Sequence, residues 1–217
     1  MRAEAFRGRD PPRGRSGTLT PTTSEAGQYL ADSIWGGSHS AAERWSESMN
    51  RDTLIDRLAV QRAVIQTHLA GLTHAELRWK SAPEEWCALE IVCHLHDEEL
   101  HDFRARLKHV LTTPAARLPA TDPVGWVQSR KYMEQDPDIV LEQFLAERAR
   151  SVEWLRSLKS APWGNVHKHP QAGPLSADLF LANWVAHDLH HLRQSIHLRY
   201  AHLSSICDTP SDYAGVW

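Results

Sequence analysis

Residues 176–201 have the sequence SADLFLANWVAHDLHHLRQSIHLRYA. Ser176 is a favoured helix N-cap, and the apolar residues after it recur every three or four positions, which predicts one long amphipathic helix. His187 and His191 are four residues apart, so both imidazoles lie on one helical face and can reach a single metal ion. The same face carries Phe180, Trp184, Gln194 and Leu198. We therefore expect this face to point into the protein interior.

A second group of histidines precedes this helix in the chain. Nine of the 14 histidines fall in two short stretches, and the first stretch contains His94, His96, His101 and His109. His94 is one helical turn from Ile91 and is expected to point inward, whereas His96 is rotated by about 200° and is expected to face solvent. His94 with the His187/His191 pair would give three neutral imidazole ligands. No fourth protein ligand is evident, and such an open arrangement is typical of a catalytic metal rather than a structural one.

The rest of the chain predicts helices and no sheet. Apolar periodicity marks four long helices, at about residues 52–70, 88–111, 137–161 and 176–201. Shorter elements are a capping box at residues 73–76 and a helix near residues 126–133, within a proline-containing connection. Four long helices with one long crossover predict an all-α four-helix bundle.

The two ends of the chain differ from this pattern. Gly, Pro, Ser and Thr occupy 20 of the first 48 positions, and the few apolar residues there are not periodic. Such a segment buries too little surface to offset the entropy of ordering it, so residues 1–48 are predicted to be a disordered extension. The bundle is assigned to residues 49–203, and residues 204–217 are assigned to a C-terminal tail.

Composition narrows the class of protein. The chain has 217 residues, 41% of them hydrophobic, and a net charge of −3, which predicts a soluble protein with no nucleic acid partner. No apolar run approaches the roughly 18 residues that a membrane span needs, so no membrane partner is expected. The three cysteines show no CxxC spacing, which indicates free thiols and a cytoplasmic location.

Two motifs carry a resemblance to a known family. Trp86-x-x-x-Glu90-x-x-x-His94-Leu, followed by His187-Asp-x-His-His191-x-x-Gln194, resembles the DinB-like (DNA-damage-inducible) superfamily over roughly residues 50–202. The resemblance implies an up-down-down-up bundle whose His94, His187 and His191 bind a divalent metal, commonly zinc, nickel or iron. It also implies a homodimer, a stress-response setting and a thiol-dependent S-transferase that uses bacillithiol, mycothiol or glutathione. The chain departs from the family at Cys87, where serine is usual; cysteine is a poor helix cap.

Several residues beside these ligands are candidates for other roles. Asp97 and Glu98 could hold a ligand imidazole through its second nitrogen or act as a base, and His101 could be an acid or base on the substrate side. Asp97 and His101 are therefore the predicted catalytic residues. Gln194 could orient a ligand, and Trp86 is expected in the core. His167 and His169 are expected near the mouth of the site, without a role.

The sequence leaves three classes of function open. The first is a metal-dependent enzyme acting on a small molecule, either a transferase with a low-molecular-weight thiol as cosubstrate or a hydrolase that uses metal-activated water. The second is a non-catalytic metal-binding protein. The third is a bundle whose histidines are packed without any metal.

Overall fold

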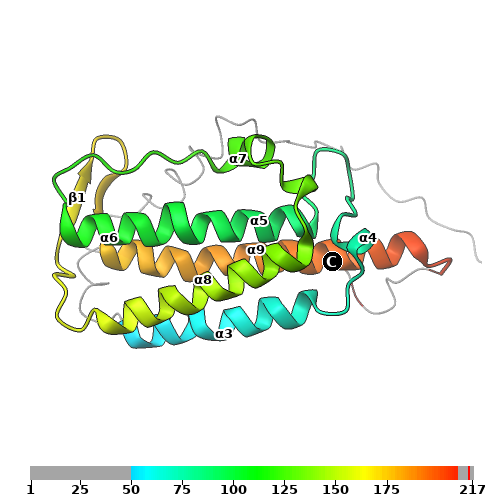
Figure 1. Ribbon diagram of the computed structural model, residues 1–217, viewed down its shortest axis with the longest axis horizontal. Helices are drawn as coiled ribbons and strands as arrows, with labels where there is room; N and C mark the ends of the chain where they lie inside the picture. Colours follow the sequence, from blue (N-terminus) through cyan, green and yellow to red (C-terminus); the bar gives the residue numbers. More distant parts are fainter. Residues whose placement is uncertain (1–49, 210–214, 216–217) are drawn as a thin grey trace, which may run out of the picture. The chain divides into compact units, whose positions relative to one another are not determined.

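The computed structural model describes residues 50–209 and residue 215. The predicted extension at residues 1–48 lies outside these residues, as does most of the predicted tail. Four long helical segments lie side by side (Figure 1). They are α3 (Arg51–Leu69), α5 (Ala88–Glu98) continued by η1 (Glu99–Phe103) and α6 (Arg104–Thr112), α8 (Pro137–Ser157), and α9 (Ala177–Ile206). The prediction of an all-α four-helix bundle is confirmed.

Three shorter helical elements lie between the long ones. They are α4 (His74–Leu77), α7 (Pro123–Ser129) and η2 (Tyr132–Glu134). The Thr73 hydroxyl accepts from the Glu76 amide at 3.2 Å and the Thr73 amide donates to the Glu76 carboxylate at 2.7 Å, so the predicted capping box is present. Ser176 caps α9 by accepting from the Leu179 amide at 3.1 Å. Local sequence therefore sets where these helices begin.

The second long segment is interrupted by a π-helical turn, η1 (Glu99–Phe103). A π turn inserts one extra residue into the helix, so residues on either side of it no longer share the expected face. Within this turn, Glu99 and Phe103 are buried. Apolar periodicity predicted a single helix here and could not show this insertion, because one added residue is within the scatter of the pattern.

Side-chain contacts fix the directions of the helices. Arg51 pairs with Asp178 at the beginning of α3 and α9, and His68 lies 2.9 Å from the Ser195 hydroxyl farther along both helices. The two helices are therefore parallel. Along α8, Arg148 contacts Glu99, and three residues later Ser151 contacts Arg104.

The Arg148–Glu99 and Ser151–Arg104 contacts make α8 parallel to the α5–α6 segment. The Asp56–Arg156 ion pair and the bond from Arg62 to the Leu145 carbonyl make α3 antiparallel to α8. The bundle is thus up-down-down-up, as the resemblance implied. The connection between α6 and α8 is the long crossover that two parallel consecutive helices require.

The segment before α9 contains a hairpin, so the prediction of no sheet is wrong. Strands β1 (Val166–His169) and β2 (Gly173–Ser176) pair antiparallel, and Gly173 has a φ of +72°, which glycine adopts without strain. Each strand has only four residues. Alternation over four residues is too short to separate a strand from a loop in sequence.

The described helices bury an apolar interior along the bundle, centred on fully buried side chains such as Leu58, Phe144, Leu107 and Leu181. Among the described residues, we find no helix with the length and apolar character needed to cross a membrane.

Candidate metal centre

The structure brings together the three histidines that the sequence singled out. His94 comes from α5, and His187 and His191 come from α9. The Nε2 atom of His187 is 3.1 Å from that of His94 and 3.2 Å from that of His191. Within the described part of the chain, these residues form the group of three potential ligands whose donor atoms all lie within 4.8 Å of one another. Such convergence from two helices is the geometry of a shared cation.

The protonation states of these imidazoles fit metal binding. Burial, together with the nearby His191, lowers the pKa of His94 to about 3. Burial also lowers the pKa of His187 and that of His191. The amide oxygen of Gln194 lies 3.0 Å from Nδ1 of His191 and can accept its N–H, which leaves the Nε2 lone pair free. The residues therefore fit a divalent metal that needs neutral imidazole ligands.

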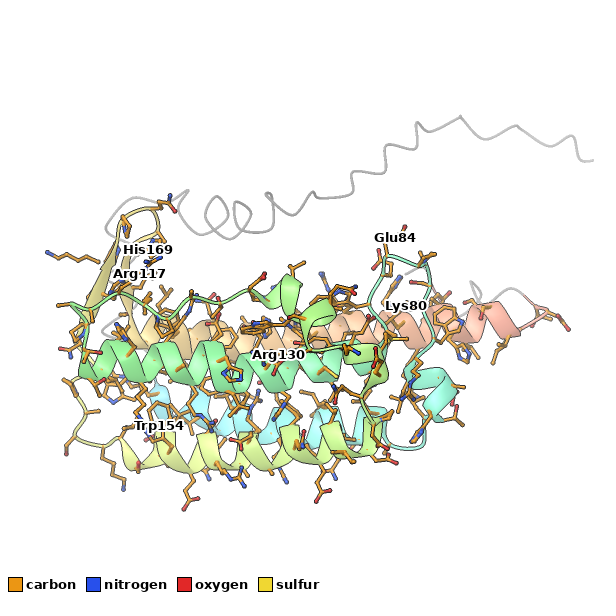
Figure 2. All side chains as sticks on the ribbon, turned by 45° about the horizontal axis from the view of Figure 1, so that its top comes forward. Lys80, Glu84, Arg117, Arg130, Trp154 and His169 are labelled. Carbon is orange, nitrogen blue, oxygen red and sulfur yellow. The ribbon has the colours of Figure 1, made fainter. Side chains whose placement is uncertain are left out.

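The expectation that Asp97 or Glu98 would hold a ligand imidazole is wrong. The buried Nδ1 atoms of His94 and His187 have no hydrogen-bond partner among the described residues. Asp97 instead binds Arg130 in an ion pair and accepts a hydrogen bond of 2.5 Å from the Tyr132 hydroxyl. It links α5 to the segment that follows α7, where Figure 2 shows Arg130 beside the middle of the bundle. The predicted catalytic role of Asp97 stays a prediction.

The second predicted catalytic residue, His101, lies at the surface. Its ring meets that of Trp126 edge-on at 5.9 Å between centroids, and the Arg130 guanidinium lies 4.4 Å from the centroid of the same tryptophan. Partial burial, with the charge of Arg130, lowers the pKa of His101. His96 is partly buried, not fully exposed as expected, and is not a member of the three-histidine group.

Aromatic side chains form walls around the three histidines. The Trp86 ring is stacked on that of His191, with 6.1 Å between centroids and 8° between planes, and is 4.9 Å from the His94 ring. Phe103 lies 5.0 Å from the His187 ring. Trp86 packs on the core as expected but also contacts two of the three histidines. Trp86 is part of the first motif, four residues before Glu90, and this position could have indicated a place beside the site. The sequence predicted only packing in the core for it.

Glu98 is the acidic side chain one turn after His94 on the same helix, and it is 4% exposed. Side chains on a helix lean toward its N-terminus, so Glu98 leans over the turn that carries His94. Its Oε1 atom is buried without a hydrogen-bond partner in the described residues. Burial, and then the nearby Asp102, raises the pKa of Glu98 to about 8. Burial therefore favours the protonated form of this carboxyl group, which the sequence could not indicate.

A layer of buried charges lies next to the site. Arg148 from α8 donates to Glu99 at 2.8 Å and binds Asp188 through both terminal nitrogens. Trp184 donates to the same Glu99 carboxylate at 3.2 Å. Asp188 directly follows His187 but is not a member of the three-histidine group, and His190 is exposed. The members of the layer come from three segments distant in sequence, so no local sequence pattern indicates it.

The hairpin histidines are not near the three-histidine group, which corrects the expectation for His167 and His169. Nδ1 of His167 lies 2.9 Å from the Pro114 carbonyl, and its ring is 6.0 Å from that of His109 on α6. Figure 2 shows His169 at the end of the bundle, whereas Arg130 lies near its middle. The hairpin therefore covers the end of the bundle.

The cysteines do not form a reactive centre. All three are free, as expected, and Cys87 and Cys93 are buried. Burial raises the pKa of Cys87 to about 11 and that of Cys93 to about 12, so both are protonated thiols at neutral pH. The Cys87 amide donates to the Glu90 carboxylate at 2.9 Å, so this half of the capping box is present without serine.

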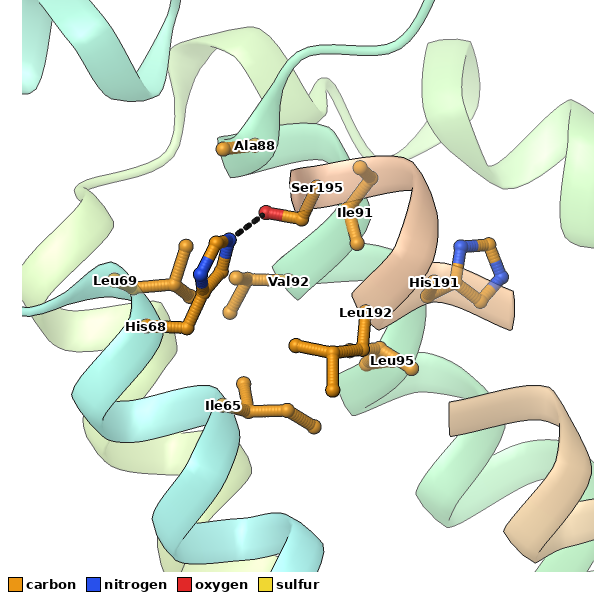
Figure 3. A pocket seen from close by; sticks show the side chains of 10 residues that line it. All are labelled: Ile65, His68, Leu69, Ala88, Ile91, Val92, Leu95, His191, Leu192 and Ser195. Carbon is orange, nitrogen blue, oxygen red and sulfur yellow. Dashed lines mark hydrogen bonds between the residues drawn. The ribbon is translucent and has the colours of Figure 1, made fainter. Parts of the chain in front are cut away.

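A serine–histidine contact lies on the other side of His191. His68 and Ser195 meet in a small hollow between α3, α5 and α9, and the His191 ring points away from it (Figure 3). Arg199 approaches Nδ1 of His68 at 3.5 Å, and an arginine can only donate there. This contact favours the tautomer in which Nε2 carries the proton and donates to Ser195, which is not the arrangement of a base acting on this hydroxyl.

Comparison with known proteins agrees with this geometry. The chain is similar to YfiT from Bacillus subtilis, described as a probable metal-dependent hydrolase with an unusual four-helix bundle topology. The two share 22% sequence identity with a TM-score of 0.62, over 70% of this chain and 89% of YfiT, which shows a common fold. Among the curated proteins, no match was found. The sequence profile of the DinB superfamily matches residues 57–195, a span that includes all three histidines, and the chain therefore belongs to the DinB superfamily.

Proposed function

We propose that this protein is a divalent-metal-dependent enzyme that transfers a group between a low-molecular-weight thiol and a small electrophile. The observation that carries the proposal is the convergence of three neutral imidazoles, from two helices, beside the aromatic walls of Trp86 and Phe103. His94, His187 and His191 would hold zinc, nickel or iron. When bound, the metal would lower the pKa of a coordinated thiol from about 8.5 and so supply a thiolate at neutral pH.

The protein residues would bind and orient the reactants. Gln194 keeps the His191 ring in the tautomer that leaves Nε2 free. Trp86 and Phe103 offer apolar surface to the electrophile. Glu98 lies one turn from His94, burial raises its pKa, and its protonated form could deliver a proton to a leaving group. The free cysteines support a reducing compartment such as the cytoplasm.

A metal-dependent hydrolase is the second candidate, and the description of YfiT favours it. The same three histidines would serve, with water in place of the thiol. The two candidates differ in whether a thiol is consumed.

Metal content is the first test. The proteins His94→Ala, His187→Ala and His191→Ala should each lose stoichiometric metal, because each lacks one of three protein ligands. His96→Ala and His190→Ala should keep it, because neither residue is in the group. Elemental analysis of the purified full chain measures this directly. Full metal in any of the three ligand variants would contradict the proposed site.

Reaction type is the second test. The metal-loaded chain is incubated with a reactive aryl halide and a panel of thiols that includes bacillithiol, mycothiol and glutathione, and the conjugate is measured by mass spectrometry. The transferase proposal expects conjugate that depends on both metal and thiol, and that His191→Ala abolishes. Hydrolysis of an activated ester without thiol, together with no conjugate, would instead assign the protein to the hydrolases.

A further inference from the structure

The three histidines are not all held in place in the same way. The amide oxygen of Gln194 lies 3.0 Å from Nδ1 of His191 and fixes the orientation of that ring. Nδ1 of His187 is buried, and it has no hydrogen-bond partner among the residues that the structure describes. A metal-ligating histidine is almost always oriented by such a bond. The orientation of the His187 imidazole therefore depends on packing.

An aromatic ring packs on the imidazole of His187. The centroid of the Phe103 ring lies 5.0 Å from that of His187, with 57° between the two planes. Phe103 is 8% exposed, so its own ring has little room to move. Aromatic pairs at this separation prefer particular mutual orientations. A rotation of the His187 imidazole would disrupt the pair, so Phe103 favours one orientation of this ligand.

The π turn η1 brings Phe103 to this side of the helix. Phe103 is nine residues after His94, so in an uninterrupted α-helix it would be rotated by about 180° from His94. The residue that a π turn adds reduces this angle by about 100°, which places Phe103 beside His187. The same insertion turns His101, seven residues after His94, toward Trp126.

A second aromatic ring packs on the other side of Phe103. Trp184 is stacked on Phe103 with 5.7 Å between centroids and 10° between planes, and it is 1% exposed. The indole N–H of Trp184 donates to Glu99 at 3.2 Å, and Arg148 donates to the same carboxylate at 2.8 Å. The layer of buried charges is therefore connected to the metal centre through two stacked rings.

We propose that Phe103 is a positioning residue of the metal centre: it fixes the imidazole of His187 for metal binding and is itself fixed by Trp184. This role differs from offering apolar surface to a substrate, because Phe103 acts on a ligand before any substrate is present. The inference rests on the proposed metal site, but it does not depend on the choice between a transferase and a hydrolase.

Metal affinity tests this role. The affinity of the full chain for Zn²⁺ is measured by competition with a chelator, and the visible absorption of bound Co²⁺ reports the ligand geometry. Phe103→Leu should bind Zn²⁺ about tenfold more weakly, at the lower end of the cost of losing a residue that orients a ligand. Its Co²⁺ absorption bands should shift or weaken. Phe103→Tyr keeps an aromatic ring and should bind Zn²⁺ more tightly than Phe103→Leu.

Phe180→Leu is the matched control. Phe180 is also 8% exposed and belongs to the same apolar cluster, but within the described part of the chain its ring contacts none of the three histidines. Both leucine variants should lose similar stability toward urea, whereas Phe180→Leu should keep the wild-type Zn²⁺ affinity and Co²⁺ spectrum. Equal affinities of the two variants would overturn the inference and leave the metal site intact. A full chain that binds no Zn²⁺ would overturn both.

A double-mutant cycle tests the part assigned to Trp184. Trp184→Phe removes the indole N–H that donates to Glu99 and keeps an aromatic ring. It should weaken Zn²⁺ binding in the wild-type chain and have little further effect in Phe103→Leu, because Trp184 acts through Phe103. Equal effects in the two chains, or no effect in either, would overturn the link between the two rings.

Discussion

Replacing Arg148 by methionine would remove the cation from the buried charge layer beside the metal centre. Arg148 and Glu99 are both 0% exposed, and Asp188 is 1% exposed. The guanidinium donates from Nε to Glu99 at 2.8 Å and from Nη2 to Asp188 at 2.9 Å, with a further bond from Nη1 to Asp188. Methionine fills most of the same volume but donates no hydrogen bond, so two buried carboxylates would remain without their cation.

The expected cost follows from the desolvation of those carboxylates. Removing one partner of a buried ion pair costs about 3–5 kcal/mol, because the remaining charge is neither solvated nor paired. Burial already raises the pKa of Glu99 in the intact protein, and the loss of Arg148 would raise it further. The native state of the variant would therefore bind protons that the unfolded chain has released. Its stability should increase as pH falls from 7 to 5.

Urea unfolding followed by circular dichroism at pH 7 measures this effect. Arg148→Met should lose about 4 kcal/mol, which corresponds to a melting temperature lower by about 10 °C. Arg150→Met is the control on the same helix, since the Arg150 side chain is 66% exposed, and it should change stability by less than about 0.5 kcal/mol. Adding Glu99→Gln and Asp188→Asn to Arg148→Met should restore much of the loss. A loss for Arg148→Met no larger than that of the control would refute the reasoning.

Three further predictions concern titration and the N-terminal segment. In metal-free protein, the contribution of neutral His94 to stability should be complete above about pH 6.5 and be lost progressively as pH falls toward 3, because the lowered pKa of His94 makes the unfolded chain bind the proton first; comparing urea midpoints of wild type and His94→Gln across this range measures it. Glu98→Gln should abolish the loss of stability that wild type shows as pH rises from about 4.5 to 8, since a carboxyl with a raised pKa stabilises only while protonated and glutamine stays neutral; equal pH profiles would contradict this. A chain starting at Met49 should melt within about 2 °C of the full chain, and a larger drop would mean that residues 1–48 pack on the bundle.

The starts of the helices could be predicted because their signals are local. Ser176 caps α9 with its own side chain, and Thr73 and Glu76 satisfy each other across one turn. Such bonds form between residues a few positions apart, so their energies depend little on the rest of the fold. The end of α9 was less certain: the helix continues to Ile206, about five residues beyond the expected end.

The three-histidine group could also be predicted, for a geometric reason. Helical spacing places His187 and His191 on one face, and the inward position of His94 follows from its distance to Ile91. The bundle brings these two inward faces together, and its register places His94 beside His187 and His191. The role of Gln194 followed from the same spacing, since it lies three residues after His191.

What the tertiary structure decided is the state of the acidic residues around the site. Asp97 and Glu98 are adjacent in sequence, yet Asp97 pairs with Arg130 from the crossover, while Glu98 is buried and its Oε1 atom has no hydrogen-bond partner among the described residues. The π turn likewise buries Glu99 against Arg148. The pKa of a carboxyl depends on its solvation and on charges within a few ångströms, and here those charges come from segments distant in sequence. The sequence by itself therefore determined the helices and the three histidines that share an inward-facing site, whereas packing between distant segments decided the surroundings of the carboxyl groups.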